Sequence, residues 1–184
     1  NRLPPNQSRT VKWPVLDASG PPELSGVQWS FGVTGLVKNP MQWSWAEFQA
    51  LPRVKVLADF HCVTRWSQLD NLWEGVSTRE IARRVEIAPE AKYVLVHAYD
   101  GGWTTNMPLD AFLAEDALFA DKRDGSPLTL EHGAPLRLIV PRLYAWKSAK
   151  WVRGVEFLAE DEAGFWEQAG YHMNGDPWTE ERFG

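Results

Sequence analysis

The alternation of apolar and polar residues along the chain predicts many strands and few helices. Runs of β-branched and aromatic residues are typical of strands, because such side chains pack well on a pleated surface. Five such runs lie at 27–33, 54–60, 93–98, 136–140 and 151–157. Glycine-containing turns are expected between them, at 100–102 and 124–127.

Three short helices are expected between the strands. Ser44 and Ser77 each stand three residues before a glutamate, a spacing in which the hydroxyl and the carboxylate satisfy free amides at a helix start. We expect helices that begin at these serines and end at Leu51 and Val85. A third helix is expected to open at Pro108, since the fixed φ of proline suits a first helical position. The predicted fold class is α+β, a single mixed and strand-rich domain.

The first 26 residues are expected to form an extended arm that lies over the surface. They are rich in proline and glycine, which disfavour regular elements, yet Val11, Trp13, Val15 and Leu16 give the arm apolar groups to bury. No internal repeat or long linker divides the chain. The prediction is therefore one domain over residues 1–184.

Composition and charge exclude several classes of protein. Of the 184 residues, 44% are hydrophobic and 23% are charged, which is ordinary for a globular protein and unlike collagen-like, disordered or membrane proteins. The net charge of -5 argues against a nucleic-acid partner. No run approaches the ~18 apolar residues of a membrane span, and residues 1–5 lack the pattern of a signal peptide. We expect a cytoplasmic protein, with export on a removed leader as the alternative.

Two features of the composition are unusual: the chain contains 11 Trp and a single Cys, Cys62. One cysteine permits neither an internal disulfide nor a zinc site of cysteine pairs. The Gly-x-Ser-x-Gly elbow, the phosphate-binding glycine loop, the dinucleotide fingerprint and the His-Glu-x-x-His motif are absent. The first candidate for chemistry is therefore Cys62.

Cys62 stands where a predicted strand runs into a polar turn, within residues 59–67. His61 and Arg65 bring positive charge near the sulfur, which favours thiolate over thiol. A thiolate suits either a transition metal or nucleophilic catalysis of the Cys-His kind. A small buried apolar residue is the structural alternative.

A basic stretch follows later in this acidic chain. It contains Arg137, Arg142, Lys147, Lys150 and Arg153, with the hydroxyl of a serine among them. Guanidinium, ammonium and hydroxyl groups together can hold one phosphate. A solvated basic face is the alternative.

Together and in this order, the Cys62 segment and the block from His132 to Trp151 resemble the sulfite oxidase family of molybdenum enzymes. The likeness is greatest to its short bacterial members, which are related to the catalytic subunit of periplasmic methionine sulfoxide reductase. Residues 1–5, 33–37 and 73–76 extend the resemblance along most of the chain.

The resemblance implies that Cys62 is the one protein ligand of molybdenum, beside two dithiolene sulfurs of molybdopterin. It also implies that His132 and Arg137 contact the pterin and its phosphate, and that His97 supplies a further contact. Asn1 and Arg2 match an early motif. The full set of implied cofactor contacts is Asn1, Arg2, His61, Cys62, His97, His132, Arg137, Ser148, Ala149 and Lys150.

The activity that the resemblance implies is two-electron oxygen-atom transfer on a small sulfur-oxo or related substrate. Arg65 and Trp66 are the candidates for the substrate pocket, Arg65 to polarise an oxygen and Trp66 to form a wall. An external haem, quinone or flavin protein would exchange the electrons. A monomer is expected, because the dimerisation domain of vertebrate-type members is absent from the chain.

Two other functions are compatible with these residues. One is a non-catalytic module that binds or carries molybdopterin, and the other is a metal-free Cys-His enzyme with His61 or His97 as base. Only some of the 11 tryptophans lie near the residues of the predicted site. Trp66, Trp73, Trp146 and Trp151 fall in or beside the cofactor motifs, and the rest are interpreted as core or surface residues: Trp13, Trp29, Trp43, Trp45, Trp103, Trp166 and Trp178.

Overall fold

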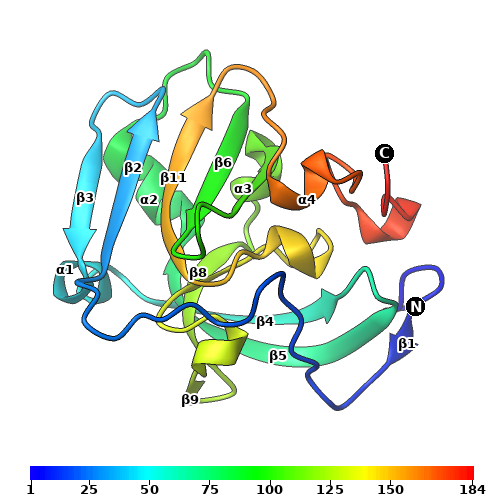
Figure 1. Ribbon diagram of the computed structural model, residues 1–184. Helices are drawn as coiled ribbons and strands as arrows, with labels where there is room; N and C mark the ends of the chain where they lie inside the picture. The colour runs from blue at the N-terminus through cyan, green and yellow to red at the C-terminus, as the bar shows by residue number, and fades with distance from the viewer.

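Two mixed β-sheets and four short α-helices form the fold, which the computed structural model describes over all 184 residues. One sheet has five strands in the order β3-β2-β11-β6-β7. The other has six, in which β1-β5-β8-β10 follow in order, β4 pairs with β5 and β9 pairs with β8. The five-stranded sheet stands upright in Figure 1, and β4 and β5 cross the lower part of the molecule. The predicted α+β, strand-rich fold class is confirmed.

The strands of the five-stranded sheet are β2 (Ser30–Gly35), β3 (Met41–Ser44), β6 (Tyr93–Ala98), β7 (Thr104–Pro108) and β11 (Val152–Leu158). The strands of the six-stranded sheet are β1 (Ser8–Arg9), β4 (Val54–His61), β5 (Trp66–Ser77), β8 (Leu118–Arg123), β9 (Ser126–Pro127) and β10 (Arg137–Ile139). Only the pairs β1 with β5 and β2 with β11 are parallel.

The five predicted strands are present, and β6 has the predicted bounds. The first prediction began too early, because β2 starts at Ser30. The longest strand, β5, was not predicted, because buried polar residues such as Gln68 and Asn71 interrupt the apolar pattern along it. Its buried amide at Asn71 donates to the carbonyl oxygens of Ala58 and Gln68, which lets a polar side chain lie inside the sheet.

The helices are α1 (Trp45–Gln49), α2 (Thr78–Val85), α3 (Leu109–Phe112) and α4 (Phe165–Gln168), with 3-10 turns η1 (Leu130–His132), η2 (Ala145–Lys147) and η3 (Pro177–Thr179). Ser44 caps α1 with the full predicted capping box. At α2, Ser77 caps the helix alone, because the carboxylate of Glu80 pairs with Arg83 and Arg84 instead. Pro108 precedes α3 as its N-cap and does not occupy the first helical position.

The six-stranded sheet buries apolar side chains on both of its faces. Along β8, Phe119 belongs to a core of 26 buried residues drawn from both sheets. Its neighbours Leu118 and Ala120 point to the opposite face, because side chains alternate along a strand, and they join a second cluster of eight residues that includes Cys62. Trp13 packs against this second cluster. Cys62 is therefore on the face of the sheet that is turned away from the main core.

The arm formed by residues 1–26 has one regular element, β1, which pairs with the start of β5. Beyond β1 the arm crosses the molecule in front of β4 and β5, as the blue segment in Figure 1 shows. The ammonium of Lys150 donates to the carbonyl oxygen of Leu16 at 2.9 Å, and Ser19 donates to Asp100 at 3.1 Å. These contacts hold the arm over the second cluster.

Gly75 marks a very close approach between two strands. A Cβ atom at this position would lie 1.8 Å from the carbonyl oxygen of Phe119 in β8. The register of β5 against β8 shifts between Glu74 and Gly75. Only glycine allows the two backbones to meet here.

None of the helices has the length and apolar character that a membrane-spanning helix requires.

Candidate functional site

A cavity of about 250 Å³ opens between the arm, the end of β4 and the segment from Ala145 to Trp151. Twenty-one residues line it, of which 14 are hydrophobic. Among the polar ones are Cys62, Arg137, Ser148 and Lys150, which are four of the site residues predicted from the sequence. The cavity thus joins the cysteine segment and the basic stretch, although they are far apart in the sequence.

Cys62 lies one residue past the end of β4, at the start of a tight turn. Its amide donates to the carbonyl oxygen of Trp66 at 2.9 Å, and its own carbonyl accepts from the amide of Arg65 at 3.0 Å. The side chain is in the cavity wall with only 6% of the residue exposed. Its Sγ lies 3.1 Å from the hydroxyl of Thr64. The turn therefore fixes the sulfur at the edge of a rigid sheet, with one face toward the cavity.

Arg137, at the start of β10, is a buried cation with no carboxylate partner. Its guanidinium donates to the carbonyl oxygens of Ser148 at 3.0 Å and His132 at 3.1 Å, and it lies 5.1 Å from the ring of Phe60. Burial lowers the pKa of Arg137 to about 9, and its interaction with Cys62 opposes that shift. Because a buried cation without a counterion is costly, this position favours an anion in the cavity.

Lys150 adds a second cation to the same wall. Burial and, to a smaller extent, the positive charge of Arg137 lower its pKa to about 8. Its ammonium donates to two carbonyl oxygens, of Leu16 and Glu131, while the carboxylate of Asp17 is 3.9 Å away. Ser148 and Ala149 line the cavity between the two cations. The polar end of the cavity is thus positively charged.

The arm closes this end of the cavity through Trp13. Its indole stacks on the imidazole of His132, with ring centroids 3.7 Å apart and planes 10° apart. The guanidinium of Arg123 lies over the same indole, 4.6 Å from its centroid. Burial, together with nearby positive charge, lowers the pKa of His132 to about 4. His132 is not itself a lining residue but supports Trp13, which is one.

The remaining wall of the cavity is aromatic. Trp103, Trp146, Trp151, Trp166 and Tyr171 all line it. The ring of Tyr171 contacts Trp146 edge-on at 5.1 Å and stacks on Trp166 at 5.0 Å. Three of these residues, Trp103, Trp166 and Tyr171, were not predicted as site residues, because the sequence offers no motif around them.

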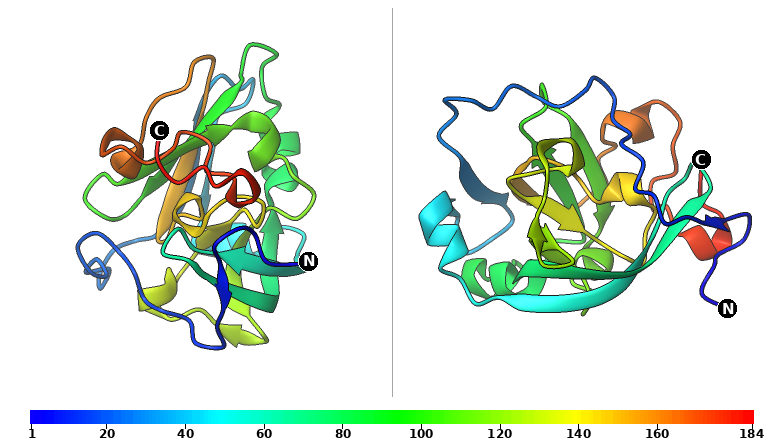
Figure 2. Two further views of the ribbon diagram at one scale, coloured as in Figure 1. Left: turned by 90° about the vertical axis from the view of Figure 1, so that its right-hand side faces the viewer. Right: turned by 90° about the horizontal axis from the view of Figure 1, so that it is seen from below.

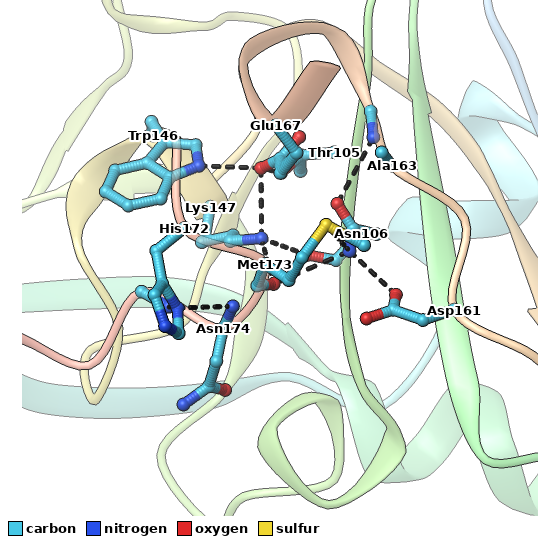
Figure 3. A network of polar contacts seen from close by, with 12 residues as sticks. Thr105, Asn106, Trp146, Lys147, Asp161, Ala163, Glu167, His172, Met173 and Asn174 are labelled. Carbon is cyan, nitrogen blue, oxygen red and sulfur yellow. Dashed lines mark hydrogen bonds and ion pairs between the residues drawn. The ribbon is translucent and has the colours of Figure 1, made fainter. Parts of the chain in front are cut away.

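A buried ion pair behind Trp146 holds this aromatic wall in place. The ammonium of Lys147 lies 2.9 Å from the carboxylate of Glu167, and neither side chain is exposed. The same carboxylate oxygen accepts from the indole of Trp146 at 2.7 Å and from Thr105 at 2.9 Å. Figure 3 shows these contacts converging on Glu167 beside β7, where Asn106 binds Asp161.

This geometry changes the interpretation of the basic stretch. Lys147 uses its ammonium on Glu167 and on the carbonyl oxygens of Asn106 and Met173, so it is not free to bind a phosphate. Arg142 and Arg153 are exposed and do not line the cavity. The stretch therefore provides only Arg137 and Lys150 to the site, not five cations.

Several predicted site residues lie outside the cavity. His61 is buried against the hydroxyl of Ser67 at 2.7 Å, and burial lowers its pKa, so it is neutral. Arg65 is exposed and does not line the cavity, whereas Trp66 does. The charge near the sulfur therefore comes from Arg137 and Lys150, and not from His61 and Arg65 as expected.

His97 and the first two residues are also placed elsewhere. His97, on β6, lies 3.3 Å from the carboxylate of Glu156 on β11. Arg2 is more than half exposed and pairs with Asp59 and Asp70, both at 2.6 Å. The side-chain oxygen of Asn1 accepts from the amide of Leu3. None of the three lines the cavity, so the structure does not bring them together with Cys62.

The protein itself offers few metal ligands. No group of three or more His, Cys, Asp or Glu side chains is arranged to hold a metal ion. A metal at Cys62 would need its other ligands from a bound cofactor. Such a cofactor would have to carry a negative charge to match Arg137 and Lys150.

Comparison with known proteins identifies relatives of the whole chain. The family model described as "Oxidoreductase molybdopterin binding domain" matches residues 18–166. The chain is 51% identical over 183 residues to the "Uncharacterized oxidoreductase YuiH" of Bacillus subtilis, covering 99% of this chain and 92% of that protein.

More distant relatives are longer proteins. The chain is 27% identical to the "Protein-methionine-sulfoxide reductase catalytic subunit MsrP" of Campylobacter jejuni, covering 81% of this chain and 57% of that protein. In a solved structure, the sulfane dehydrogenase SoxCD of Paracoccus pantotrophus, a similar fold has a TM-score of 0.65 at 21% identity. That match covers 72% of this chain and 38% of the other, and it supports the fold alone.

Proposed function

This chain belongs to the oxidoreductase molybdopterin binding domain family, and on that premise we propose that it transfers an oxygen atom in a two-electron reaction at a molybdenum centre held by Cys62. The protein is an oxidoreductase of the molybdopterin-dependent kind. The Cys62 ligation, the reaction and the substrate are our proposals.

The observation that carries the proposal is the placement of an uncompensated buried cation in the same cavity as the single cysteine. Arg137 has carbonyl partners but no carboxylate, and Lys150 lies in the same wall. A molybdopterin brings a phosphate that these two groups can hold. The donor set therefore fits the cofactor: one soft thiolate for the metal and two cations for the phosphate.

When bound, the cofactor supplies a metal that can exchange two electrons and an oxygen atom with a substrate. The protein residues hold the cofactor in place and shield it from water. Cys62 fixes the metal end at the edge of the six-stranded sheet, and Arg137 and Lys150 bind the phosphate. Trp13 and the arm exclude water from that end, which strengthens the electrostatic contacts there.

The lining of the cavity favours an uncharged organic oxo substrate, such as a sulfoxide, over a small oxyanion. Its two cations are assigned to the phosphate, and its other charged residues are the carboxylates Asp17 and Asp100. A carboxylate repels an anion such as sulfite. The aromatic wall, including Trp66, instead offers apolar contacts and a ring surface to a sulfur-containing group.

The test begins with protein made in a host that synthesises the cofactor. The wild-type protein should contain about one Mo and one pterin per chain, measured by elemental analysis and by the fluorescence of released pterin. Cys62→Ser should lose most of the Mo while keeping the fold, as judged by circular dichroism. Wild-type protein without Mo and pterin would refute the proposal.

Turnover distinguishes the proposed enzyme from a carrier of the cofactor. With a reduced dye as electron donor, the loaded protein should reduce a small dialkyl or aryl sulfoxide, and with an oxidised dye it should act poorly on sulfite. Bound cofactor without turnover of either substrate would favour a carrier. Turnover of sulfite far above that of sulfoxides would contradict the proposed substrate class.

A further inference from the structure

The net negative charge of the chain is concentrated in residues 159–184, which we call the C-terminal segment. It contains seven Asp and Glu and one Arg, a net charge of -6, whereas the whole chain has -5; residues 1–158 therefore carry +1. Glu167 is neutralised by Lys147, but Glu160 and Glu162 are exposed. Figure 2 (left) shows α4 and the rest of this segment on one side of the molecule. A surface of this sign attracts a basic protein.

Exposed aromatic groups lie on the same segment, in contact with the cavity wall. Phe183 is 67% exposed, and its ring lies 5.4 Å from that of Tyr171, which lines the cavity. Phe165 is 47% exposed and packs 5.2 Å from Trp166, another lining residue. Large exposed apolar groups of this kind mark interaction sites when they are gathered together. Here a single ring contact separates the surface from the cavity.

A second connection links Phe183 to Cys62 through the backbone. The buried guanidinium of Arg182 donates to the carbonyl oxygen of Val63, the residue that follows Cys62, and to the side-chain oxygen of Gln7 at 2.9 Å. Covalent bonds and this one hydrogen bond therefore join Cys62 to Phe183. The aromatic contact and the backbone route converge on the same exposed ring.

The ion pair of Figure 3 keeps this segment rigid. Lys147 binds the carbonyl oxygen of Met173 and the carboxylate of Glu167, both in the C-terminal segment, and Asn106 binds Asp161. Surface groups that are fixed relative to the cavity can serve as a docking site without an ordering cost.

We propose that the C-terminal segment, including the exposed ring of Phe183, is the docking surface for a basic protein that carries single electrons. This inference rests on the proposed function, since the oxidoreductase must exchange electrons with a partner. In the reducing direction, two reduced carriers and two protons from solvent convert a sulfoxide into a sulfide and water, and two oxidised carriers leave. Each docking passes one electron, so two carriers dock in succession for each turnover.

The experiment uses the loaded protein with cytochrome c, a basic haem protein, as the probe. Affinity is measured by isothermal titration calorimetry at low ionic strength. Glu160→Gln/Glu162→Gln should weaken the binding about tenfold, because two attractive charges are removed from the interface. Glu23→Gln/Glu90→Gln is the matched control: it has the same net charge but changes exposed residues outside the C-terminal segment, and its affinity should stay within about twofold.

Phe183→Ser tests the electron route separately. The reduced, loaded protein is mixed with oxidised cytochrome c at saturating concentration, and the haem absorbance reports the rate. This rate should fall about tenfold, whereas Leu57→Ser, which changes an equally exposed apolar residue on β4, should leave it unchanged. Activity with a small dye should stay the same in both variants, because a dye needs no docking surface.

The outcomes separate this inference from the proposed function. Equal affinities of the two double variants, or equal rates of the Phe183 and Leu57 variants, overturn the docking surface while dye-linked turnover leaves the proposed function intact. Wild-type protein without Mo and pterin overturns both. A wild-type dimer that Phe183→Ser converts to monomers would show that this face joins two copies of the chain, and it would also overturn the inference.

Discussion

The indole of Trp13 stacks on the imidazole of His132, with ring centroids 3.7 Å apart. The contact joins the N-terminal arm to the turn before β10, and it covers a histidine that is surrounded by the cations Arg137, Lys150 and Arg123. Burial is the main reason that the pKa of His132 falls to about 4, and these charges add to it. His132 is therefore neutral at pH 7, and the arm maintains that state.

Removing the stacked ring should raise the pKa of His132. In Trp13→Ala the imidazole gains water, so its pKa should move from about 4 toward the ordinary value of 6.5. An NMR titration of the histidine ring protons would measure it. Val15→Ala changes a neighbouring arm residue that does not line the cavity and should leave the pKa where it was. An unshifted value in Trp13→Ala would mean that the arm does not bury His132.

The same histidine predicts how stability depends on pH. Between about 6.5 and about 4, the unfolded chain binds a proton on His132 that the folded chain does not. The free energy of unfolding should therefore fall as the pH drops through this window. Burial also lowers the pKa of His61, which acts in the same direction. Urea denaturation of His132→Gln should show a shallower dependence than wild type; identical slopes would contradict the assignment.

Breaking the buried pair of Lys147 and Glu167 should be costly. Glu167→Leu leaves an ammonium without its counterion among carbonyl oxygens, and unfolding free energy should fall by about 3–5 kcal/mol. The double variant Lys147→Met/Glu167→Leu should recover part of that loss, because no buried charge is left unpaired. Arg83→Ala, which removes a mostly exposed pair with Glu80, should cost under about 1 kcal/mol. A single variant as stable as this control would refute the prediction.

Cofactor retention should depend on Arg137 more than on the other arginines of its stretch. Arg137→Met removes the guanidinium from the cavity and should lower the Mo and pterin content of purified protein about tenfold or more. Arg137→Lys should not restore it fully, since an ammonium cannot reproduce the two contacts with Ser148 and His132. Arg153→Met is the control, because that side chain is exposed. Equal loss in both methionine variants would point to a general effect of charge.

Adding a single methyl group at Gly75 tests the close contact between β5 and β8. Gly75→Ala places a methyl group 1.8 Å from the carbonyl oxygen of Phe119, so the strands must separate, at a cost of about 3 kcal/mol. Gly32→Ala on β2 meets nothing within 4 Å and should be nearly neutral. Thermal unfolding of the two variants gives the comparison. Equal midpoints would show that β5 and β8 can adjust at no cost.

The sequence predicts most accurately those elements in which apolar residues are buried and few polar residues interrupt the pattern. β6 was predicted with its exact bounds because its residues are nearly all apolar and buried. β5 was missed because a strand with Gln68 and Asn71 inside it resembles a polar turn until its partners are known. The hydrogen bonds that make these residues tolerable come from distant parts of the chain, and no local pattern contains them.

The site residues likewise divide into those that the local sequence identifies and those whose role depends on partners that the fold brings close. Cys62, Arg137 and Lys150 could be selected from the sequence because their chemistry is unusual in its context, and they do line one cavity. Lys147 belongs to the same basic stretch, yet it turns inward to Glu167, a partner that only the fold supplies. Trp13 and Trp166 come from opposite ends of the chain, so neither could be assigned to the wall before the tertiary structure was known.

Because the walls of the cavity come from distant parts of the chain, they are made in a fixed order during biosynthesis. The cavity has walls from Trp13 at one end of the chain and from Trp166 and Tyr171 near the other. At a synthesis rate of about 5–20 residues per second, the ribosome makes Trp166 roughly 8–30 s after Trp13, so the early part of the chain can begin to fold before the late part exists. The cavity therefore has all of its walls only after Tyr171 has been translated. Whatever fills the cavity can be enclosed only after that point, and a product truncated before Trp166 would lack one wall of the cavity.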